Sequence, residues 1–128
     1  MIGQHRVWAN RFMSEHNDTG KKGEDLAAGF LVDNGFRILR RNYKSGRHEI
    51  DIIAQRDDWL LFVEVKTRTS ADFGHPEEFV NASQAVRIVR AAEEFIFSIN
   101  WQGHIRFDII SVEIGTKAKI VHFEDAIN

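Results

Sequence analysis

Residues 48–68 constrain the fold most, because they predict two β-strands joined by a tight turn. Apolar residues dominate His48–Arg56 and Trp59–Arg68, and the Asp57-Asp58 pair between them is compatible with a two-residue hairpin. Side chains on a strand alternate between its two faces. This alternation predicts that three charged residues converge on one face of the hairpin: Asp51, Glu64 and Lys66.

Two interpretations account for these charges in otherwise apolar strands. Burying a charge typically costs several kcal/mol unless the group is paired, hydrogen-bonded or bound to a metal. In the first interpretation, Lys66 forms a structural salt bridge with Glu64 or Asp51. In the second, the two carboxylates repel one another and bind a hard divalent cation such as Mg²⁺, which keeps several waters in its shell. One such water is then the nucleophile, and Lys66 orients it or stabilises the developing phosphorane charge.

The composition indicates one domain and excludes several kinds of site. At 128 residues, 43% of them hydrophobic, the chain is long enough for one core and short for two. The absence of cysteine excludes disulfides, thiolate metal sites and thiol nucleophiles. No run approaches the roughly 20 apolar residues of a membrane span, and residues 1–18 lack the apolar core of a signal peptide. We therefore expect a cytoplasmic protein without a membrane partner, with an N-terminal extension (1–18) and one domain (19–128).

A first helix is predicted from Thr19, a capping residue, to Gly35, which suits a helix stop. Within it, Glu24 lies one turn above an apolar face that should meet the sheet. Either Glu24 takes part in a site on that sheet, or it is an acidic residue favoured by the dipole of the helix N-terminus.

Cations are concentrated in residues 36–47, which are predicted to contain a strand. The net charge of the chain is −2, yet residues 1–48 contain nine Lys and Arg against five Asp and Glu. Cations interleaved with an aromatic residue and an amide suit contact with a phosphate backbone. A solvated edge strand protected by charge explains the same pattern. The candidate phosphate-binding residues, with one more at the end of the hairpin, are Arg41, Asn42, Lys44, Arg47 and Arg68.

A second helix and two further strands complete the predicted fold. Residues 70–78 read as a loop, and 80–100 as a helix with an apolar stripe at Ile88, Ala92, Phe95, Ile96 and Ile99. Gln84 lies one turn before this stripe, and either it belongs to the edge of the site or it lies in a solvated first turn. Strands are expected at 105–114 and 118–123, which gives the order α-β-β-β-α-β-β and a mixed sheet with helices against it.

Several motifs together resemble the YraN family of bacterial proteins, over roughly residues 20–115. The segments that carry the resemblance are Gly23–Ala28, Arg41–Tyr43, Glu49–Ile53, Phe62–Arg68, Phe73-Gly74 and Arg90–Ala92. That family looks like a branch of the restriction-endonuclease-like PD-(D/E)XK nucleases and is related in fold to archaeal Holliday-junction resolvases. The resemblance implies an α/β fold with an α-β-β-β-α-β core. It also implies that Asp51 and Glu64 bind Mg²⁺ or Mn²⁺, that Lys66 assists the water, and that Glu24 completes the acidic site.

Two residues depart from the pattern of that family. His48 stands where glycine usually precedes Glu-Ile-Asp, and its side chain is expected to point away from the Asp51 face. Gln84 stands where many members carry lysine, which removes a cation that could bind phosphate or stabilise a transition state. The substitution bears on turnover more than on metal binding.

Three functions follow from these patterns. The first is a Mg²⁺-dependent endonuclease acting on DNA, in particular branched or structured DNA, and working as a homodimer by analogy with resolvase-like nucleases. The second is a catalytically inactive nucleic-acid-binding module of the same fold. The third is an interaction protein in which the charged strands form only internal ion pairs. A histidine metal cluster, nucleotide binding and serine hydrolysis lack the required motifs.

Overall fold

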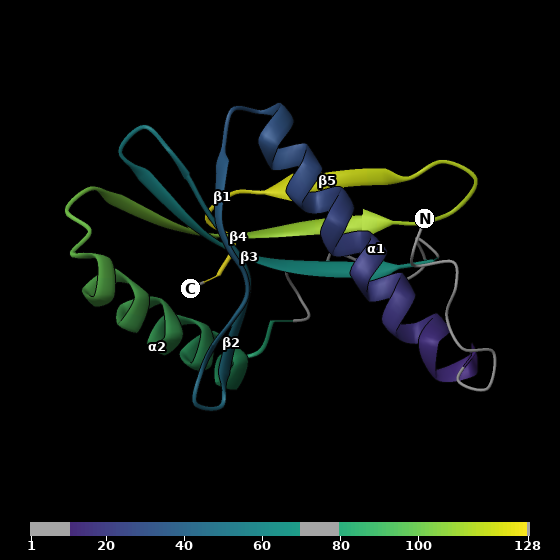
Figure 1. Cartoon of the computed structure of the whole chain (residues 1–128), viewed down its shortest axis with the longest axis horizontal. Coiled ribbons are helices and arrows are strands. Elements are labelled where there is room, and N and C mark those ends of the chain that lie inside the picture. Colours follow the sequence, from purple (N-terminus) through teal and green to yellow (C-terminus); the bar gives the residue numbers. More distant parts are fainter. Residues whose placement is uncertain (1–10, 70–79, 128) are drawn as a thin grey trace.

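The structure, a computed structural model, describes the backbone of residues 11–69 and 80–127 and the side chains of 19–69 and 80–127. The described residues form an α/β fold with the predicted order α-β-β-β-α-β-β (Figure 1). The elements are α1 (Arg11–Asp33), β1 (Arg37–Ser45), β2 (His48–Arg56), β3 (Trp59–Arg68), α2 (Ala82–Ile99), β4 (His104–Glu113) and β5 (Lys119–Phe123). The predicted loop at 70–78 and most of the predicted extension lie outside the described residues.

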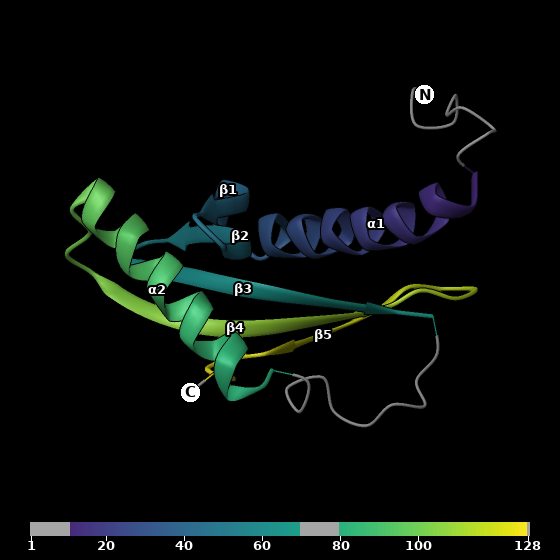
Figure 2. The ribbon, with the colours of Figure 1, turned by 90° about the horizontal axis from the view of Figure 1, so that it is seen from below.

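The strands form one mixed sheet in the order β1-β2-β3-β4-β5. Consecutive strands pair antiparallel except β3 and β4, which pair in parallel and are connected through α2. A parallel pair requires a crossover connection, which α2 provides. Figure 2 shows β3, β4 and β5 extending side by side.

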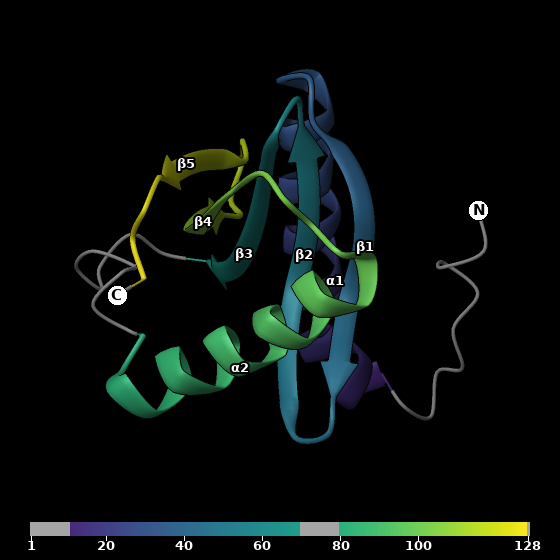
Figure 3. The same ribbon diagram turned by 90° about the vertical axis from the view of Figure 1, so that its left-hand side faces the viewer.

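The two helices cover opposite faces of the sheet, and the alternation along β3 shows this directly. Leu61 and Val63 pack in one core cluster with Ala27 and Leu31 of α1. The side chains between and beside them, Leu60 and Phe62, pack in a second cluster with residues of α2: Ala85, Ile88, Ala91, Ala92 and Phe95. In Figure 3, α1 lies behind β1 and β2 and α2 lies on the near side. Because β3 is buried on both faces, any charged residue it carries must be stabilised by nearby groups.

The first helix begins earlier than predicted, at Arg11 instead of Thr19. Threonine and glycine inside a helix cost about 1 kcal/mol or less each, so a potential cap does not by itself end a helix. The C-terminal end agrees with the prediction. Gly35 has φ +89°, its N–H donates to the Val32 carbonyl over 3.0 Å, and the Phe36 N–H donates to the Leu31 carbonyl over 2.9 Å. This is a Schellman motif, which requires the left-handed conformation that glycine adopts readily.

The second helix is two residues shorter at its start than predicted and one shorter at its end. Asn81 caps it, since the Asn81 side chain accepts a hydrogen bond from the Gln84 N–H over 2.8 Å. Of the predicted apolar stripe, Ile88, Ala92 and Phe95 are buried, but Ile99 is 39% exposed. Its burial was therefore wrongly predicted, because the helix ends at Ile99 and its last turn extends past the core. Neither described helix combines the length and apolarity needed to cross a membrane.

Candidate active site

A polar pocket of about 190 Å³ lies where β2, β3 and α2 meet. Its lining combines acidic side chains from the strands with polar and cationic side chains from α2 and from the turn before β2. The lining residues are Arg47, Glu49, Asp51, Glu64, Gln84, Arg87 and Ile88. The predicted convergence of Asp51 and Glu64 is therefore present in the structure.

Asp51 lies where β2 and β3 stop pairing with one another. The last paired residues are Ile52 and Val63, and beyond them the two strands separate. The N–H of Val65, in the separated part of β3, donates instead to Oδ2 of Asp51 over 2.8 Å. The carboxylate thus takes the place of a backbone carbonyl and faces the opening between the strands.

Glu64 is held by two groups at one oxygen atom. Nε2 of Gln84 donates to Oε2 of Glu64 over 3.0 Å, and Nζ of Lys66 lies 3.4 Å from the same oxygen. The side chain of Glu64 is only 13% exposed, and that of Lys66 22%. Gln84 therefore faces the sheet, which is one of the two interpretations that the helical spacing left open, and connects α2 to the charged end of β3.

Both carboxyl groups are disfavoured in their ionised forms. Burial, followed by the negative charge of Glu64, raises the pKa of Asp51 to about 7, although the hydrogen bond from Val65 opposes this change. Burial also raises the pKa of Glu64, against the opposing effects of the Lys66 ammonium and the Gln84 amide. Two largely buried acids thus lie close together; the Lys66 ammonium contacts one of them, Glu64, and Arg47 and Arg87 add positive charge at the pocket.

The donor atoms of this pair suit a magnesium ion. Mg²⁺ prefers oxygen ligands and is commonly held by one or two carboxylates together with waters. Asp51 and Glu64 supply two carboxylates and no nitrogen or sulfur ligand. Within residues 19–69 and 80–127, no group of three or more His, Cys, Asp and Glu side chains is arranged to hold a metal ion. The set therefore fits a hydrated dication and not a fully protein-ligated one.

Glu24, predicted to complete the acidic site, lies close enough to raise the pKa of Asp51, but its own contacts are with β1. Oε1 of Glu24 accepts hydrogen bonds from Nε of Arg41 over 3.1 Å and from Nδ2 of Asn42 over 3.0 Å. Arg41 also forms an ion pair of 2.6 Å with Asp25. The structure therefore places Arg41 and Asn42, two predicted phosphate-binding residues, beside acidic groups of α1.

The approach of α1 to this region depends on Gly23. Its Cα lies against Thr67 of β3, and a Cβ added at position 23 would overlap Oγ1 of Thr67. Only glycine fits here, although glycine is unfavourable inside a helix. The contact sets the position of Glu24, the next residue, beside the part of β3 that carries Lys66.

The remaining predicted cations are spread over the edge of the site. Arg47 lines the pocket, Lys44 is exposed on β1, and Arg68 is half-buried at the end of β3.

Arg87 and Glu49 also line the pocket, although neither was predicted as a site residue. Their signal was present, since Glu49 precedes Asp51 by two residues in a strand and Arg87 follows Gln84 by three in a helix. His48 does not line the pocket. Its Nδ1 atom is buried and has no hydrogen-bond partner within the part of the chain that the structure describes.

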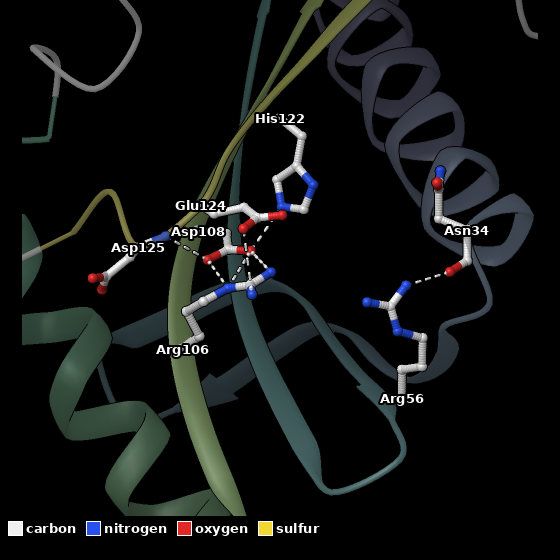
Figure 4. Close-up of polar contacts among 7 residues, drawn as sticks. All are labelled: Asn34, Arg56, Arg106, Asp108, His122, Glu124 and Asp125. Carbon is white, nitrogen blue, oxygen red and sulfur yellow. Dashed lines mark hydrogen bonds and ion pairs between the residues drawn. The ribbon is translucent and has the colours of Figure 1, made fainter.

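A second polar cluster surrounds Asp108 on β4 and has a structural role (Figure 4). The carboxylate of Asp108 is fully buried and accepts hydrogen bonds from Nε and Nη2 of Arg106, each at 2.9 Å, and from the backbone N–H of Asp125 at 2.9 Å. Nε2 of His122 lies 2.7 Å from its Oδ2. Burial alone would raise the pKa of Asp108, but these hydrogen bonds hold it below its usual value. The cluster fixes β5 and the C-terminal residues against β4.

The comparisons with known proteins place this chain in a family. Residues 23–112 match the model of the uncharacterised protein family UPF0102. This range includes the candidate site residues Glu24, Asp51, Glu64, Lys66 and Gln84. The chain is 50% identical to a UPF0102 protein of Flavobacterium psychrophilum over 115 residues, which cover 89% of this chain and 97% of the relative. It is 45% identical over 114 residues to one of Dictyoglomus thermophilum, covering 88% of this chain and 97% of the relative. It is 42% identical over 116 residues to a UPF0102 protein of Christiangramia forsetii, covering 89% of this chain and 97% of the relative. The chain therefore belongs to the UPF0102 family, also called the YraN family.

Proposed function

We propose that this protein is a Mg²⁺- or Mn²⁺-dependent phosphodiesterase that acts on DNA, in the manner of the PD-(D/E)XK nucleases. The observation that carries the proposal is the convergence of two largely buried carboxylates, Asp51 and Glu64, from adjacent strands, with the Lys66 ammonium beside Glu64. The order of the elements around this pair supports it, because an α-β-β-β-α-β core is what the resemblance to those nucleases implies.

A structural salt bridge accounts for only part of the charge in the pocket. A cation paired with a carboxylate lowers the pKa of that carboxylate. The pKa of Asp51 instead rises to about 7, because burial and the charge of Glu64 outweigh every favourable contact it makes. The Lys66 ammonium accompanies Glu64 but leaves the pKa of Asp51 raised, whereas a dication between the two carboxylates would favour the ionised form of both. The raised pKa of Asp51 therefore favours a metal site over a purely structural ion pair.

The side chains of the pocket have distinct roles in this proposal. Asp51 and Glu64 would hold Mg²⁺, which when bound would polarise a phosphoryl oxygen and lower the pKa of a water. Nζ of Lys66 is near Glu64 and can donate to that water or to a phosphate oxygen. Arg47 and Arg87 add two fixed positive charges at the pocket, suited to phosphate groups of the substrate.

The substrate class rests on the cations and on the resemblance. Lys44, Arg47 and Arg68 lie on or beside the strands that carry the carboxylates, and such cations bind a phosphodiester backbone without reading its sequence. Likeness to Holliday-junction resolvases points to branched or structured DNA. We therefore infer recognition by backbone and shape, with a steep dependence of affinity on salt.

One observation favours the alternative, a nucleic-acid-binding module without catalysis. The neutral amide of Gln84 occupies a donor position at Glu64 where a cation would stabilise transition-state charge better. With Gln84 in that position, Lys66 is the ammonium group paired with Glu64. The alternative predicts DNA binding that depends on salt but does not respond to Mg²⁺.

The test compares two identical substitutions in the β2–β3 hairpin. Asp51→Asn removes a proposed ligand, whereas Asp57→Asn changes an exposed turn residue with φ +55°, which asparagine adopts readily. Calorimetric titration with Mn²⁺ and Mg²⁺ should give saturable binding to the wild type and the Asp57→Asn variant and none to the Asp51→Asn variant. Equal metal binding by all three proteins would contradict the assignment of Asp51.

Cleavage is measured on a four-way DNA junction and on a linear duplex of the same composition. We expect Mn²⁺- or Mg²⁺-dependent cleavage by the wild type, and loss of cleavage in the Asp51→Asn and Lys66→Met variants with DNA affinity retained. Metal binding and DNA binding without cleavage would favour the alternative function. Absence of DNA binding at low salt would refute both.

A further inference from the structure

The outer face of α2 carries large apolar side chains that no described part of the chain covers. Phe97 is 87% exposed and Val86 52% exposed. Together with Arg90 and Glu93 they follow the spacing i, i+4, i+7 and i+11, which places all four on one stripe opposite the buried face. Such a stripe is the pattern of a helix that packs against another helix.

A hollow of about 460 Å³ lies at the N-terminal half of this stripe. Its apolar walls come from four residues of α2 at the spacing i, i+3, i+4 and i+7: Ala82, Ala85, Val86 and Val89. Ala85 also belongs to the buried face of α2, so the hollow lies on the flank of the stripe, between the stripe and the sheet. Arg90 and Glu93 complete the lining. The apolar surface of α2 therefore extends from the stripe onto its flank.

We infer that a second copy of this chain covers the stripe, with the two α2 helices packed antiparallel about a two-fold axis between Arg90 and Glu93. In this register Phe97 of one copy faces Val86 of the other, beside the hollow. Arg90 of each copy faces Glu93 of the other. A two-fold interface requires such reciprocity, since residue i contacts residue j and residue j contacts residue i.

The charges of Arg90 and Glu93 favour a second copy as the partner and an antiparallel arrangement of the two helices. A parallel pair would place Arg90 opposite Arg90 and Glu93 opposite Glu93, which costs free energy through repulsion. The antiparallel pair converts both into opposite-charge contacts and places each Phe97 ring against a Val86 side chain. A single pair of helices buries less area than a standard interface, so we expect a dimer with a Kd on the order of micromolar.

Charge reversal tests the register within one chain. Arg90→Glu places a carboxylate opposite Glu93 of the other copy on both sides of the two-fold axis. Glu93→Arg likewise places a cation opposite Arg90 on both sides. The double variant Arg90→Glu/Glu93→Arg restores opposite charges across the axis. Asp33→Arg is the control, because it makes the same change of charge as Glu93→Arg on an exposed residue of α1, away from the outer face of α2.

Sedimentation equilibrium of the full chain, without metal or DNA, provides the measurement. We expect a concentration-dependent dimer for the wild type and the Asp33→Arg variant. Each single reversal, and Phe97→Ser, should raise the Kd at least about tenfold, and the double reversal should return it towards the wild-type value. All substituted residues are exposed, so circular dichroism should report unchanged folding. A wild type that stays monomeric up to millimolar concentration, or a double reversal no better than the single ones, would overturn the inference.

Discussion

The side-chain amide of Gln84 donates to Oε2 of Glu64 over 3.0 Å, so that the first turn of α2 is joined to the charged end of β3 by a neutral group. Lys66 contacts the same oxygen at 3.4 Å. A carboxylate held by two donors on one oxygen keeps its other oxygen for further contacts. The helix that covers the sheet thus also controls the charge balance of the pocket.

Replacing Gln84 by glutamate should make the stability of the protein depend on pH and on Mg²⁺. At about pH 8 the Gln84→Glu variant places a further carboxylate beside Glu64, and we expect a loss of roughly 1–3 kcal/mol in the free energy of unfolding. Near pH 5 the added group can hold a proton and donate it to Glu64, so the loss should be small. Urea denaturation at both pH values, with and without millimolar Mg²⁺, measures the effect.

Gln84→Met is the matched control, because it keeps the length of the side chain and removes only the hydrogen bond. We expect it to cost about 1 kcal/mol at either pH, with no recovery on adding Mg²⁺. If the Gln84→Glu variant lost no more stability at pH 8 than the Gln84→Met variant, the acidic groups of the pocket would not disfavour a further negative charge beside Glu64.

The raised pKa of Asp51 predicts that the pocket destabilises the fold as pH rises. Its pKa is about 7 in the folded protein against 3.8 for the ordinary carboxyl group, so the folded state binds the proton more tightly. Between about pH 4 and pH 7 the folded state therefore holds more protons than the unfolded state, and this residue lowers stability by up to about 1.4 kcal/mol per pH unit. Above pH 7 the loss is complete and the contribution levels off.

Asp51→Asn removes this titration while keeping an oxygen that can accept from the Val65 N–H. In metal-free buffer the variant should be more stable than the wild type at about pH 8 and similar to it near pH 4, since only the ionised carboxylate is unfavourable. The difference between the two free energies of unfolding, followed by urea denaturation across this range, isolates Asp51 from the histidines. An unchanging difference would show that Asp51 ionises normally in the folded protein.

Local patterns predicted the hairpin and the face of its charges. The bounds of β2 and β3 agree with the prediction because period-two alternation and a two-residue turn are properties of neighbouring residues. The same alternation placed Glu64 and Lys66 on the face covered by α2. The start of α1 was wrong because Thr19 is a permitted helical residue as well as a preferred cap.

Contacts between distant segments could not be predicted in this way. Arg41 meets Glu24 across 17 residues, and the contact exists only because β1 lies beside α1. In the sequence Arg41 resembles any exposed cation of an edge strand. The cluster around Asp108 was missed for the same reason, since Arg106, His122 and the Asp125 N–H meet only once β4 and β5 have paired.

Substitution by alanine should change the stability of the protein in opposite directions at two glycines of α1, Gly23 and Gly29. Alanine is favoured over glycine inside a helix by about 0.5–1 kcal/mol. At Gly29 an added Cβ meets nothing within 4 Å, so Gly29→Ala should stabilise the protein by about that amount. At Gly23 the Cβ would overlap Thr67, and we expect Gly23→Ala to lose about 1–3 kcal/mol despite the better propensity. Thermal denaturation compares the two.

A double variant identifies the contact responsible. Gly23→Ala combined with Thr67→Gly removes the overlapping side chain, and should recover more stability than Thr67→Gly costs alone. If Gly23→Ala were as stabilising as Gly29→Ala, α1 would not approach β3 as closely as described.

Asp108 should contribute more to stability than any exposed ion pair of the chain. Asp108→Asn would leave the Arg106 guanidinium, 19% exposed, without its carboxylate, and we expect a loss of about 3–5 kcal/mol at neutral pH. Because its pKa lies below the ordinary value, the wild-type contribution is complete above about pH 4 and is lost as pH falls further. Asp58→Asn is the control, since Asp58 pairs with His104 at 3.5 Å with both side chains more than 60% exposed, and should cost less than about 1 kcal/mol.

Hydrogen exchange locates the effect of Asp108→Asn within the fold. The Asp125 N–H donates to the Asp108 carboxylate, and the next N–H, of Ala126, donates to the Phe107 carbonyl over 2.8 Å. Loss of the carboxylate should therefore release the C-terminal residues and remove exchange protection from the Ala126 amide. Amides of the β2–β3 hairpin should stay protected, with protection limited only by the lower free energy of global unfolding. Retained protection at Ala126, relative to the hairpin, would show that Asp108 stabilises the sheet as a whole and does not hold the C-terminal segment.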